Sequence, residues 1–189
     1  MSSTQPLEGL RVLDFSRVLS GPFATMTLAD LGAEIVKVEH PEKGDDTRSF
    51  GPPFLDGVST YFLSVNRGKQ SIGLDLKRGE DRVLVWRLIE KADVLIENFR
   101  PGVMERLGFG WEAVHLKNSK LIYCSISGFG QESNEPGYDL MVQGLSGIPS
   151  ITGTGDPLKC GASIADLVAG MNAVQGILAA LYQREVSGQ

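Results

Sequence analysis

The chain alternates short runs of consecutive apolar residues with longer stretches in which apolar residues recur at the spacing of one helix face. Consecutive apolar residues are typical of strands buried on both faces, and such strands alternating with helices indicate βαβ units around a parallel sheet. The pattern therefore predicts an α/β fold with an open, mostly parallel sheet and helices on both of its faces. The predicted strands are 11–15, 35–38, 71–76, 94–96 and 121–125, and the predicted helices are 23–31, 79–91, 111–117 and 164–183.

Glycine and proline mark the boundaries of the first helix and two long loops. Pro22 suits the first position of a helix, where no backbone N–H is needed, and Gly32 suits the residue after its end. The segment 40–58 is rich in Gly, Pro and Asp and follows the second predicted strand, so we expect a long loop there. A second glycine-rich segment covers 128–161. In an open α/β sheet ligands bind beyond the carboxyl ends of the strands, which places the expected site beside these loops.

The composition is that of an ordinary globular protein. Of the 189 residues, 42% are hydrophobic and 22% charged, which separates the chain from disordered sequences. The net charge of −5 argues against a nucleic-acid-binding protein, which needs a surplus of Lys and Arg to contact phosphates. The length predicts one domain spanning residues 1–189. Tyr61, Phe62 and Trp86 are the expected aromatic members of its core.

Neither the cysteines nor the N-terminus indicates a secreted or membrane protein. Cys124 and Cys160 are far apart in the sequence and form no C-x-x-C pair, so we expect two buried free thiols rather than a zinc site or a disulfide. The N-terminal segment MSSTQPLEGL has no basic stretch followed by an apolar one, and no run of ~18 apolar residues occurs. The expected location is the cytoplasm or an organellar matrix, without a metal, membrane or nucleic-acid partner.

Two glycine motifs resemble nucleotide-binding loops, but the residues around them do not fit such loops. Gly108, Gly110 and Ala113 match the spacing of a dinucleotide-binding motif, but the preceding VMERL segment has a helical pattern where the motif requires a strand. Gly68 and Lys69 match the end of a P-loop, but no glycine stands five positions earlier and a glutamine follows in place of Ser or Thr. A G-x-S-x-G serine-hydrolase motif is also absent from the sequence.

Asp166 allows two interpretations at the start of the long apolar helix. In the first, Ser163 is the N-cap and Asp166, three residues later, reaches back to a free backbone N–H, which makes a structural capping box. In the second, the positive end of the helix dipole keeps the Asp166 carboxylate ionised, so that it acts as a nucleophile in a closed pocket. Spacing alone favours the capping box, because caps are common and catalytic carboxylates are rare. The two interpretations are compatible.

Six segments in order resemble those of the family III coenzyme A transferases, the CaiB/BaiF family. They are PLEGLRVLDFSRVLSGPFATMTLADLGAEIVKVEHPEKGDDTR, NRGKQSIGLDLK, ADVLIENFRPGVMERLG, IYCSISGFGQ, GYDLMVQGLSG and GASIADLVAGM. They cover nearly the whole chain in a fixed order, which is a more specific signal than one glycine pattern. The resemblance implies a Rossmann-like, CoA-binding and catalytic domain, the N-terminal part of a longer fold whose smaller C-terminal domain and glycine-rich closing loop are absent from this chain. It also implies an interlocked homodimer.

The resemblance implies a reaction and a nucleophile. In this family the aspartate of the last motif, here Asp166, carries the acyl group as an anhydride and the coenzyme as an aspartyl-CoA thioester. CoA is thereby moved from an acyl-CoA donor to a carboxylic acid, and no metal or permanently bound cofactor takes part. This outweighs the argument from spacing and favours the nucleophile over the capping box.

The resemblance assigns further residues to the binding of CoA. Lys77 and Arg106 match phosphate or adenine contacts, and the alternative for each is a solvated charge at the end of an element. His40 stands where an arginine is frequent, so a solvent-facing loop histidine is an equal alternative. Asn98 and Phe99 match the place where the thioester end passes the sheet. The matched coenzyme contacts are Leu19, Ser20, His40, Leu74, Lys77, Asn98, Phe99, Arg106 and Leu107.

Two alternatives to transfer remain. Racemases of 2-methylacyl-CoA esters in this family use a histidine at the place of Tyr138, and a phenol with an ordinary pKa near ~10 is a poor base at neutral pH. Transfer is therefore favoured, with Tyr138 and Asp139 orienting the substrate or simply beginning the next helix. The second alternative is a CoA-binding module without turnover. Family members use dicarboxylates, formate, oxalate, carnitine derivatives or bile acids, and the segments GDDTR and GPP favour the dicarboxylate type.

Overall fold

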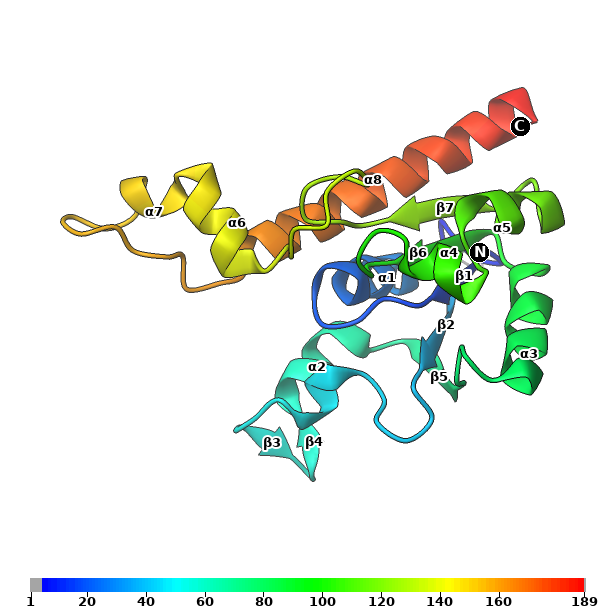
Figure 1. Cartoon of the computed structure of the whole chain (residues 1–189), viewed down its shortest axis with the longest axis horizontal. Helices are drawn as coiled ribbons and strands as arrows, with labels where there is room; N and C mark the ends of the chain where they lie inside the picture. The colour runs from blue at the N-terminus through cyan, green and yellow to red at the C-terminus, as the bar shows by residue number, and fades with distance from the viewer. Residues whose placement is uncertain (1–4, 189) are drawn as a thin grey trace.

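The computed structural model describes residues 5–188 and contains a five-stranded sheet whose neighbouring strands are all parallel (Figure 1). The strands lie in the order β5-β2-β1-β6-β7, so the first strand is central and the chain winds outward to both edges. This is the order of a Rossmann-type sheet, which confirms the predicted α/β class. The strands are β1 (Arg11–Asp14), β2 (Glu34–Glu39), β5 (Lys69–Gly73), β6 (Val94–Glu97) and β7 (Ile122–Ser125).

The first hydrophobic layer lies between the sheet and two helices, α1 (Ser20–Asp30) and α8 (Ile164–Ser187). Leu28 of α1, Ile96 of β6 and Ile177 of α8 are each at most 1% exposed. Removing such a side chain from water stabilises the fold by about 1.5–3 kcal/mol. The helix that begins with the candidate nucleophile is therefore anchored to the sheet by its middle turns.

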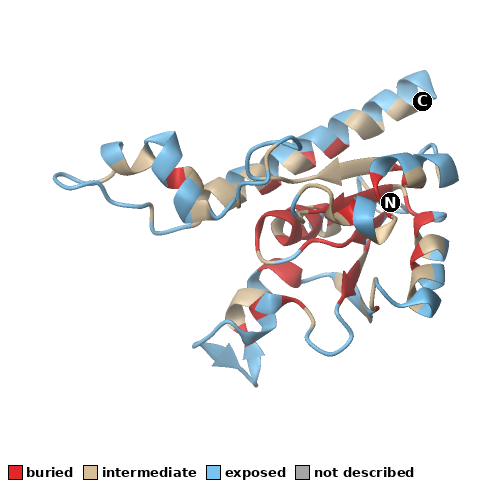
Figure 2. Ribbon diagram, viewed as in Figure 1, coloured by how far each residue is buried: buried red, intermediate tan, exposed pale blue. Residues whose placement is uncertain are grey.

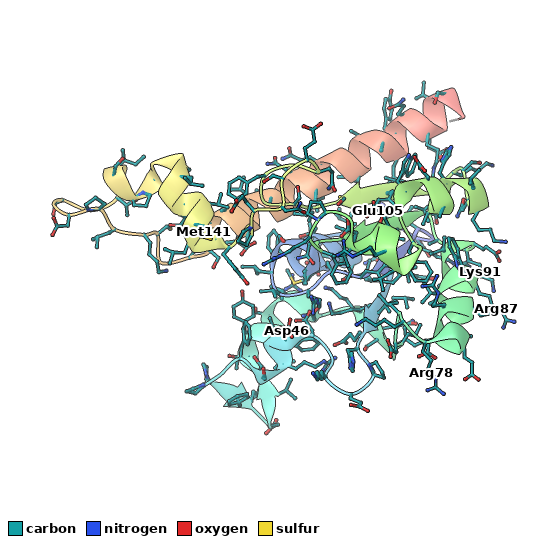
Figure 3. All side chains as sticks on the ribbon, in the orientation of Figure 1. Asp46, Arg78, Arg87, Lys91, Glu105 and Met141 are labelled. Atoms are coloured by element: carbon teal, nitrogen blue, oxygen red, sulfur yellow. The ribbon has the colours of Figure 1, made fainter. Side chains whose placement is uncertain are left out.

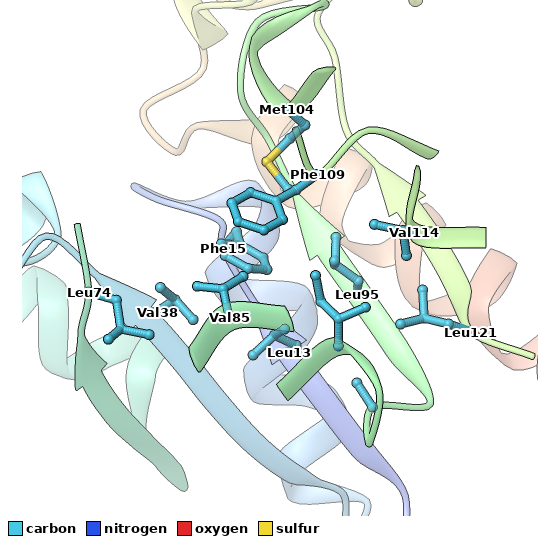
Figure 4. Close-up of a cluster of buried hydrophobic side chains, with 12 residues drawn as sticks. Leu13, Phe15, Val38, Leu74, Val85, Leu95, Met104, Phe109, Val114 and Leu121 are labelled. Carbon is cyan, nitrogen blue, oxygen red and sulfur yellow. The ribbon is translucent and has the colours of Figure 1, made fainter. Parts of the chain in front are cut away.

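The second hydrophobic layer lies on the other face of the sheet (Figure 4). Phe109 is fully buried there, and the partly buried Trp86 packs on it with 5.2 Å between ring centroids. The prediction for Trp86 is thus correct in place, whereas Phe62 is half-buried outside this layer, with the Arg48 guanidinium 3.8 Å from its ring centroid. The helices of the second layer are α3 (Gly79–Ile89), α4 (Val103–Leu107) and α5 (Trp111–Lys117).

Two parts of the chain project from this sandwich of helices and sheet, and Figure 2 shows them as largely exposed. One follows β2 and contains a short hairpin; the other precedes α8 and contains two helices. The first part consists of the 3-10 helix η1 (Asp46–Ser49), β3 (Phe54–Leu55), β4 (Val58–Ser59) and α2 (Thr60–Asn66). The second consists of α6 (Asp139–Ser146) and α7 (Ile148–Ile151).

The structure corrects several predicted boundaries. Helix α1 begins at Ser20, so Pro22 occupies its third position rather than its first. This is tolerated because none of the first backbone N–H groups of a helix has a partner within the helix. Strand β5 begins two residues before the predicted start at Ser71, and the expected loop 40–58 contains η1 and the hairpin. The helical pattern assigned to VMERL is confirmed as α4, which supports rejecting the dinucleotide-binding motif.

Helix α8 is long and apolar enough to cross a membrane when judged by length and composition alone, with a mean hydropathy of 1.6 over its most apolar window. Only 17% of that window is buried, but Val174 and Ile177 pack against the sheet. The helix therefore belongs to the layered fold on one side, while its outward side is bare among the described residues.

Both cysteines are free among the described residues, as predicted, but they are half-buried rather than buried. Burial, and then the negative charge of Glu97, raise the pKa of the Cys124 thiol to about 11. A thiol that stays protonated is a weak nucleophile, so Cys124 is a packing residue.

Candidate active site

A cleft of about 770 Å³ runs along the carboxyl edge of the sheet. Its walls come from the loops after all five parallel strands, from the segment 135–142 at the start of α6, and from the first two turns of α8. The volume lies within the usual range for small-molecule sites. Strands β1 and β6 are neighbours at its centre, and the chain leaves them toward opposite edges, so the cleft lies at the topological switch point where α/β sheets bind ligands.

Ten of the twelve residues expected at the site line this cleft, whereas Leu19 and Arg106 do not. Leu19 is 8% exposed and packs with Met26 and Val65. Arg106 is exposed on α4, with its guanidinium beside Gly102. Matching by position places a residue in a segment but does not give the direction of its side chain. The lining residues are Ser20, His40, Leu74, Lys77, Asn98, Phe99, Leu107, Tyr138, Asp139 and Asp166.

Asp166 lies in the first turn of α8 and is not part of a capping box. Ser163 takes the N-cap position, but its side chain makes no cap hydrogen bond. The cap comes from another helix, because the Asp139 carboxylate accepts the Ala165 N–H at 2.9 Å. Among residues 5–188, no group donates to the Asp166 carboxylate or pairs with it. The capping-box interpretation is therefore wrong, and a free carboxylate faces the cleft.

Burial, and second the negative charge of Asp139, raise the pKa of Asp166 to about 6. Most molecules still carry an ionised Asp166 at pH 7, and this carboxylate is more basic than an ordinary aspartate. Since nucleophilic strength rises with basicity within one class of group, the shift favours attack on a carbonyl carbon. Burial and Asp139 thus act against the ionised form that the helix dipole is expected to favour, and the argument from the dipole leaves both out.

Gln143 joins α6 to the segment that leads into α8. The side chain is fully buried, and its Nε2 donates to Asp139 Oδ2 at 2.7 Å and to the Ala162 carbonyl at 3.2 Å. Its Oε1 accepts the Cys160 N–H at 2.8 Å. These bonds fix the start of α8, and with it Asp166, against α6. Sequence reasoning missed Gln143, although its spacing of four residues from Asp139 on one helix face was an available signal.

A network of buried charges lies on the opposite side of the cleft, at the ends of β1 and β2. Asp14, Lys37 and Asp45 are each at most 1% exposed. Lys37 Nζ pairs with Asp45 at 2.9 Å, and Lys69 Nζ pairs with Asp14 at 3.2 Å. Burial alone would raise the pKa of Asp14, but Lys37 and Lys69 lower it overall. Sequence reasoning placed Lys37 in a strand without a role; a lysine in an apolar strand signals a buried partner.

Tyr61 lies close enough to the site for its phenol to interact with the charge of Asp166. Its ring is half-buried and packs edge-on against Phe50, with 5.6 Å between ring centroids. Burial, followed by the negative charges of Asp166, Asp45 and Asp139, raises the pKa of the phenol. The phenol therefore keeps its proton as a hydrogen-bond donor within electrostatic range of three carboxylates. The core prediction for Tyr61 is correct for the ring and incomplete for the hydroxyl.

The cationic side chains of the cleft are the groups able to hold an anionic ligand. Lys77 and Arg100 are exposed, and the Arg17 guanidinium lies 5.2 Å from the Phe99 ring centroid. His40 is an exposed loop histidine whose Nδ1 accepts two backbone N–H groups, which leaves Nε2 for a ligand. Among residues 5–188, no group of three or more His, Cys, Asp or Glu side chains is arranged to hold a metal ion.

Residues 7–189 match a protein-family model described as CoA-transferase family III. The succinyl-CoA:glutarate CoA-transferase of Mus musculus is 48% identical over 192 residues, which covers 99% of this chain and 44% of the mouse protein. The acetyl-CoA:oxalate CoA-transferase of Acetobacter aceti is 50% identical over 190 residues, which covers 97% of this chain and 49% of that protein. The chain thus spans about half the length of the curated relatives it matches.

The similarity extends to three dimensions. The crystal structure of a CaiB/BaiF family protein from Brucella suis superposes with a TM-score of 0.94 and 44% identity, over 99% of this chain and 52% of that chain. The orthorhombic crystal structure of Rv3272 from M. tuberculosis superposes with a TM-score of 0.90 and 38% identity, over 98% and 53% of the two chains. The similarity thus covers nearly all of this chain and about half of each crystal structure.

Proposed function

The chain belongs to CoA-transferase family III, and on that basis we propose that the protein moves coenzyme A from an acyl-CoA thioester to a carboxylic acid. The observation that carries this proposal is the Asp166 carboxylate, which is half-buried, open to the cleft and unpaired among the described residues. A carboxylate in this setting suits covalent catalysis. CoA thioesters enter as substrates, and the proposed reaction uses no permanently bound cofactor.

In the proposed first half-reaction, an oxygen of Asp166 attacks the thioester carbonyl carbon of the donor. The carbon–sulfur bond breaks, CoA leaves as a thiolate, and a mixed anhydride joins the acyl group to Asp166. The thiolate then attacks Cγ of Asp166, and the donor acid departs as a carboxylate. The product is an aspartyl-CoA thioester. The first attack needs an ionised Asp166, which a pKa of about 6 provides at neutral pH, and the nucleophile of the second attack is the thiolate released by the first.

In the proposed second half-reaction, the acceptor carboxylate attacks Cγ of the aspartyl-CoA thioester and again expels CoA thiolate. The thiolate attacks the acceptor carbonyl of the new anhydride, which gives the product acyl-CoA and restores the Asp166 carboxylate. No net redox change occurs, and the thioester bond energy is conserved throughout. The order of events is therefore ping-pong.

Each attack creates an oxyanion that needs hydrogen-bond donors. We assign this role to the first turn of α1, whose backbone N–H groups have no side-chain cap at Leu19. Ser20 of this turn lines the cleft, and α1 approaches α8 closely there, since a Cβ on Gly170 would lie 2.6 Å from the Ser20 carbonyl oxygen. Leu19 then supports the turn by packing and does not touch the coenzyme.

We propose that the remaining lining residues bind the two substrates. Lys77 would hold the phosphates of CoA, Asn98 and Phe99 would flank the thioester end, and Tyr138 and Asp139 would orient the acyl group. Arg106 has no place in this proposal because it lies outside the cleft. The proposed coenzyme contacts are Ser20, His40, Leu74, Lys77, Asn98, Phe99 and Leu107.

We propose a dicarboxylic acid as the acceptor. The names of the Mus musculus and Acetobacter aceti relatives contain glutarate and oxalate, which are both dicarboxylic acids. A second carboxylate needs a cation in the cleft, and Arg17 offers one, since its contact with Asp46 is long at 3.4 Å and exposed. An exposed pair of this kind is worth little and is readily exchanged for a ligand.

Racemisation is the second candidate, and one observation weighs against it. Racemisation needs a base that removes the α-proton at neutral pH. The residue at that position is Tyr138, which is 67% exposed, and a phenol is a poor base at neutral pH. Binding without turnover is the third candidate. The cleft residues named here all lie within the described chain, but relatives are about twice as long.

We also propose a homodimer. Helices α6 and α8 expose a set of large apolar side chains that water would not normally face in a monomer. Analytical ultracentrifugation over a range of concentrations tests this, and a sedimenting species of 20.4 kDa at all concentrations would contradict it. The exposed apolar residues are Leu140, Met141, Leu145, Val168, Met171, Leu178, Tyr182 and Val186.

Intact-protein mass spectrometry tests the covalent step. The chain is mixed with succinyl-CoA and then trapped with hydroxylamine or borohydride, and peptide mapping locates the modified residue. We expect a hydroxamate or a reduced side chain at Asp166, absent from the Asp166→Asn variant. Asp156→Asn, which removes the same charge from an exposed loop, is the matched control and should react as the wild type does. CoA binding without any modification would support the non-catalytic candidate.

A further inference from the structure

Val18 adopts a backbone conformation that a β-branched residue rarely takes. Its φ angle is 68°, in the left-handed region that favours glycine. Among residues 5–188 the one other non-glycine residue with a positive φ is Asp56, in the turn of the β3–β4 hairpin. Val18 lines the cleft, in the loop between β1 and α1. Such a conformation persists only where the surroundings impose it, and it is most frequent at functional sites.

The two residues before Val18 are held by side chains from neighbouring strands. Lys37 Nζ, on β2, donates to the Ser16 carbonyl at 2.7 Å. Asn98, just after β6, binds Arg17 on both sides: its Oδ1 accepts the Arg17 N–H at 2.8 Å and its Nδ2 donates to the Arg17 carbonyl at 2.7 Å. The backbone that enters Val18 therefore has little freedom.

Asp45 holds Val18 itself. Its Oδ1 accepts the Val18 N–H at 3.3 Å and the Thr47 N–H at 2.9 Å. Its Oδ2 lies 2.9 Å from Lys37 Nζ and makes no hydrogen bond. The carboxyl group is fully buried, and its contacts with Lys37 and Thr47 fix its position independently of Val18. Its neighbour Asp46, labelled in Figure 3, is exposed.

The direction of the chain at Val18 decides where the first turn of α1 lies. Val18 and Leu19 pack in one cluster with Leu167, the residue after Asp166. The Ser20 carbonyl lies so close to α8 that only glycine fits at Gly170. Because α1 and α8 pack closely here, a change of φ at Val18 would shift the α1 N–H groups relative to the Asp166 carboxylate.

We propose that Asp45, anchored by Lys37, is a positioning residue that holds Val18 in the left-handed conformation and so sets the α1 turn against Asp166. The proposal rests on the transfer function proposed above. A competing explanation is that the Asp45–Lys37 pair only stabilises the fold. The two differ in one respect, because glycine adopts the conformation of Val18 without steric cost. Replacing Val18 by glycine should therefore compensate for the loss of Asp45 in positioning but not in stability.

The test compares Asp45→Asn, Val18→Gly and the double variant for the rate of covalent modification by succinyl-CoA, with thermal unfolding measured in parallel. We expect Asp45→Asn to slow modification by about 10- to 100-fold, because displacing the donors costs less than the about 100- to 1,000-fold lost when one donor is removed outright. In the double variant at least about 10-fold of that loss should return, although the melting temperature stays low. Val18→Gly alone is the reference for the double variant, because it shows the effect of the glycine while Asp45 is in place. Asp156→Asn, which removes a charge from an exposed loop outside the cleft, is the control and should be neutral.

If Asp45→Asn does not fold, Asp45→Glu provides the second test, because it keeps a charge for Lys37 while the longer side chain displaces the acceptor of the Val18 N–H. Val18→Gly should then restore the rate lost in Asp45→Glu. A slowed Asp45→Asn or Asp45→Glu variant that Val18→Gly does not improve, or an Asp45→Asn variant as fast as the wild type, would overturn the proposal.

A spectroscopic measurement separates this proposal from the proposed function. The intraresidue nuclear Overhauser effect (NOE) between the Val18 N–H and Hα reports the sign of φ, because the two hydrogens are closest when φ is about +60°, and it can be measured whether or not the chain reacts with succinyl-CoA. We expect a strong NOE in the wild type, which indicates a positive φ, and a weak one in Asp45→Asn, which indicates a negative φ. If the wild type forms no adduct but the NOE changes as stated, the transfer function fails and the positioning contact stands; an unchanged NOE overturns the positioning role itself.

Discussion

Asp166 lines the cleft, Asp14 is buried behind its opposite wall, and the two carboxyl groups differ in almost every physical respect. Asp14 ends β1, is fully buried, accepts a hydrogen bond from Thr25 Oγ1 at 2.6 Å and pairs with Lys69. Burial would raise its pKa, but the lysines and hydroxyl groups lower it overall. Asp166 has no partner among the described residues, and burial together with Asp139 raises its pKa to about 6.

The difference shows how one fold assigns two uses to one residue type. On the β1–β2 side the buried carboxylates pair with a lysine or an arginine, so their charges stabilise the fold. On the α6–α8 side Asp139 is tied to a helix N-terminus and to Gln143, and its presence makes Asp166 harder to ionise. A carboxylate left without a partner in a half-buried place retains its reactivity. Substitutions on each side test this difference.

The largest effect should come from Asp14→Asn. It leaves Lys69 buried without its counter-charge, and breaking a buried pair costs about 3–5 kcal/mol. Urea denaturation at pH 7 measures the free energy of unfolding. Asp30→Asn, which breaks the exposed pair with Arg67, should cost less than about 1 kcal/mol. Equal losses in the two variants would mean that the Asp14 network is not a structural unit.

Gln143→Leu should have the next largest effect. It keeps the volume but leaves the Cys160 N–H and the Ala162 carbonyl without partners, which costs about 1–3 kcal/mol. Hydrogen exchange should show faster opening of the segment before α8 than in the wild type. Gln175→Leu, on the exposed side of α8, is the control and should leave exchange unchanged. Unchanged protection in Gln143→Leu would show that the α6–α8 tether is not what fixes Asp166.

Asp166→Asn should make the fold slightly more stable at pH 8. The folded pKa is about 6 and the ordinary value is 3.8, so between these values the folded chain binds a proton that the unfolded chain does not. Stability therefore falls as pH rises through this window, and the variant avoids that loss. Because the group is only half-buried, we expect a gain of no more than about 1 kcal/mol at pH 8. Thermal unfolding at pH 8 and pH 4.5 should give a larger gain at pH 8, and the reverse order would contradict the raised pKa.

The smallest effect concerns the charge of Asp139. In Asp139→Asn one oxygen remains to accept the Ala165 N–H, the hydrogen bond from Gln143 is lost, and a negative charge near Asp166 is removed. Carbon-13 NMR titration of the Asp166 carboxyl should give a midpoint of about 6 in the wild type and a lower one in the variant. Modification by succinyl-CoA should follow the same titration and be lost below it, since the ionised form attacks. Asp156→Asn should leave the midpoint in place; a shift there as large as in Asp139→Asn would rule out a local effect.

Much of the fold followed from local pattern. The apolar runs gave four of the five parallel strands close to their observed places, and the helical spacing of VMERL gave α4. The hairpin was missed because its residues bury little. The alternative in which Tyr138 and Asp139 begin a helix is confirmed by α6, whose extent was not predicted. The residue that caps α8 was also not predicted. Ser163 and Asp166 have the spacing of a capping box, but the donor at Ala165 is taken by Asp139, a residue 26 positions away.

The alternation of strand and helix, the place of the cleft at the strand ends, and the identity of Asp166 as the residue to test could all be read from the amino-acid sequence. Local periodicity and ordered motifs carry that information because both are properties of neighbouring residues. Only the tertiary structure decided which charges are paired. Asp14 meets Lys69, Asp45 meets Lys37 and Val18, and Asp166 meets no partner in the described chain. Ionisation and reactivity depend on burial and on charges brought close by folding, and no run of neighbouring residues records either of these.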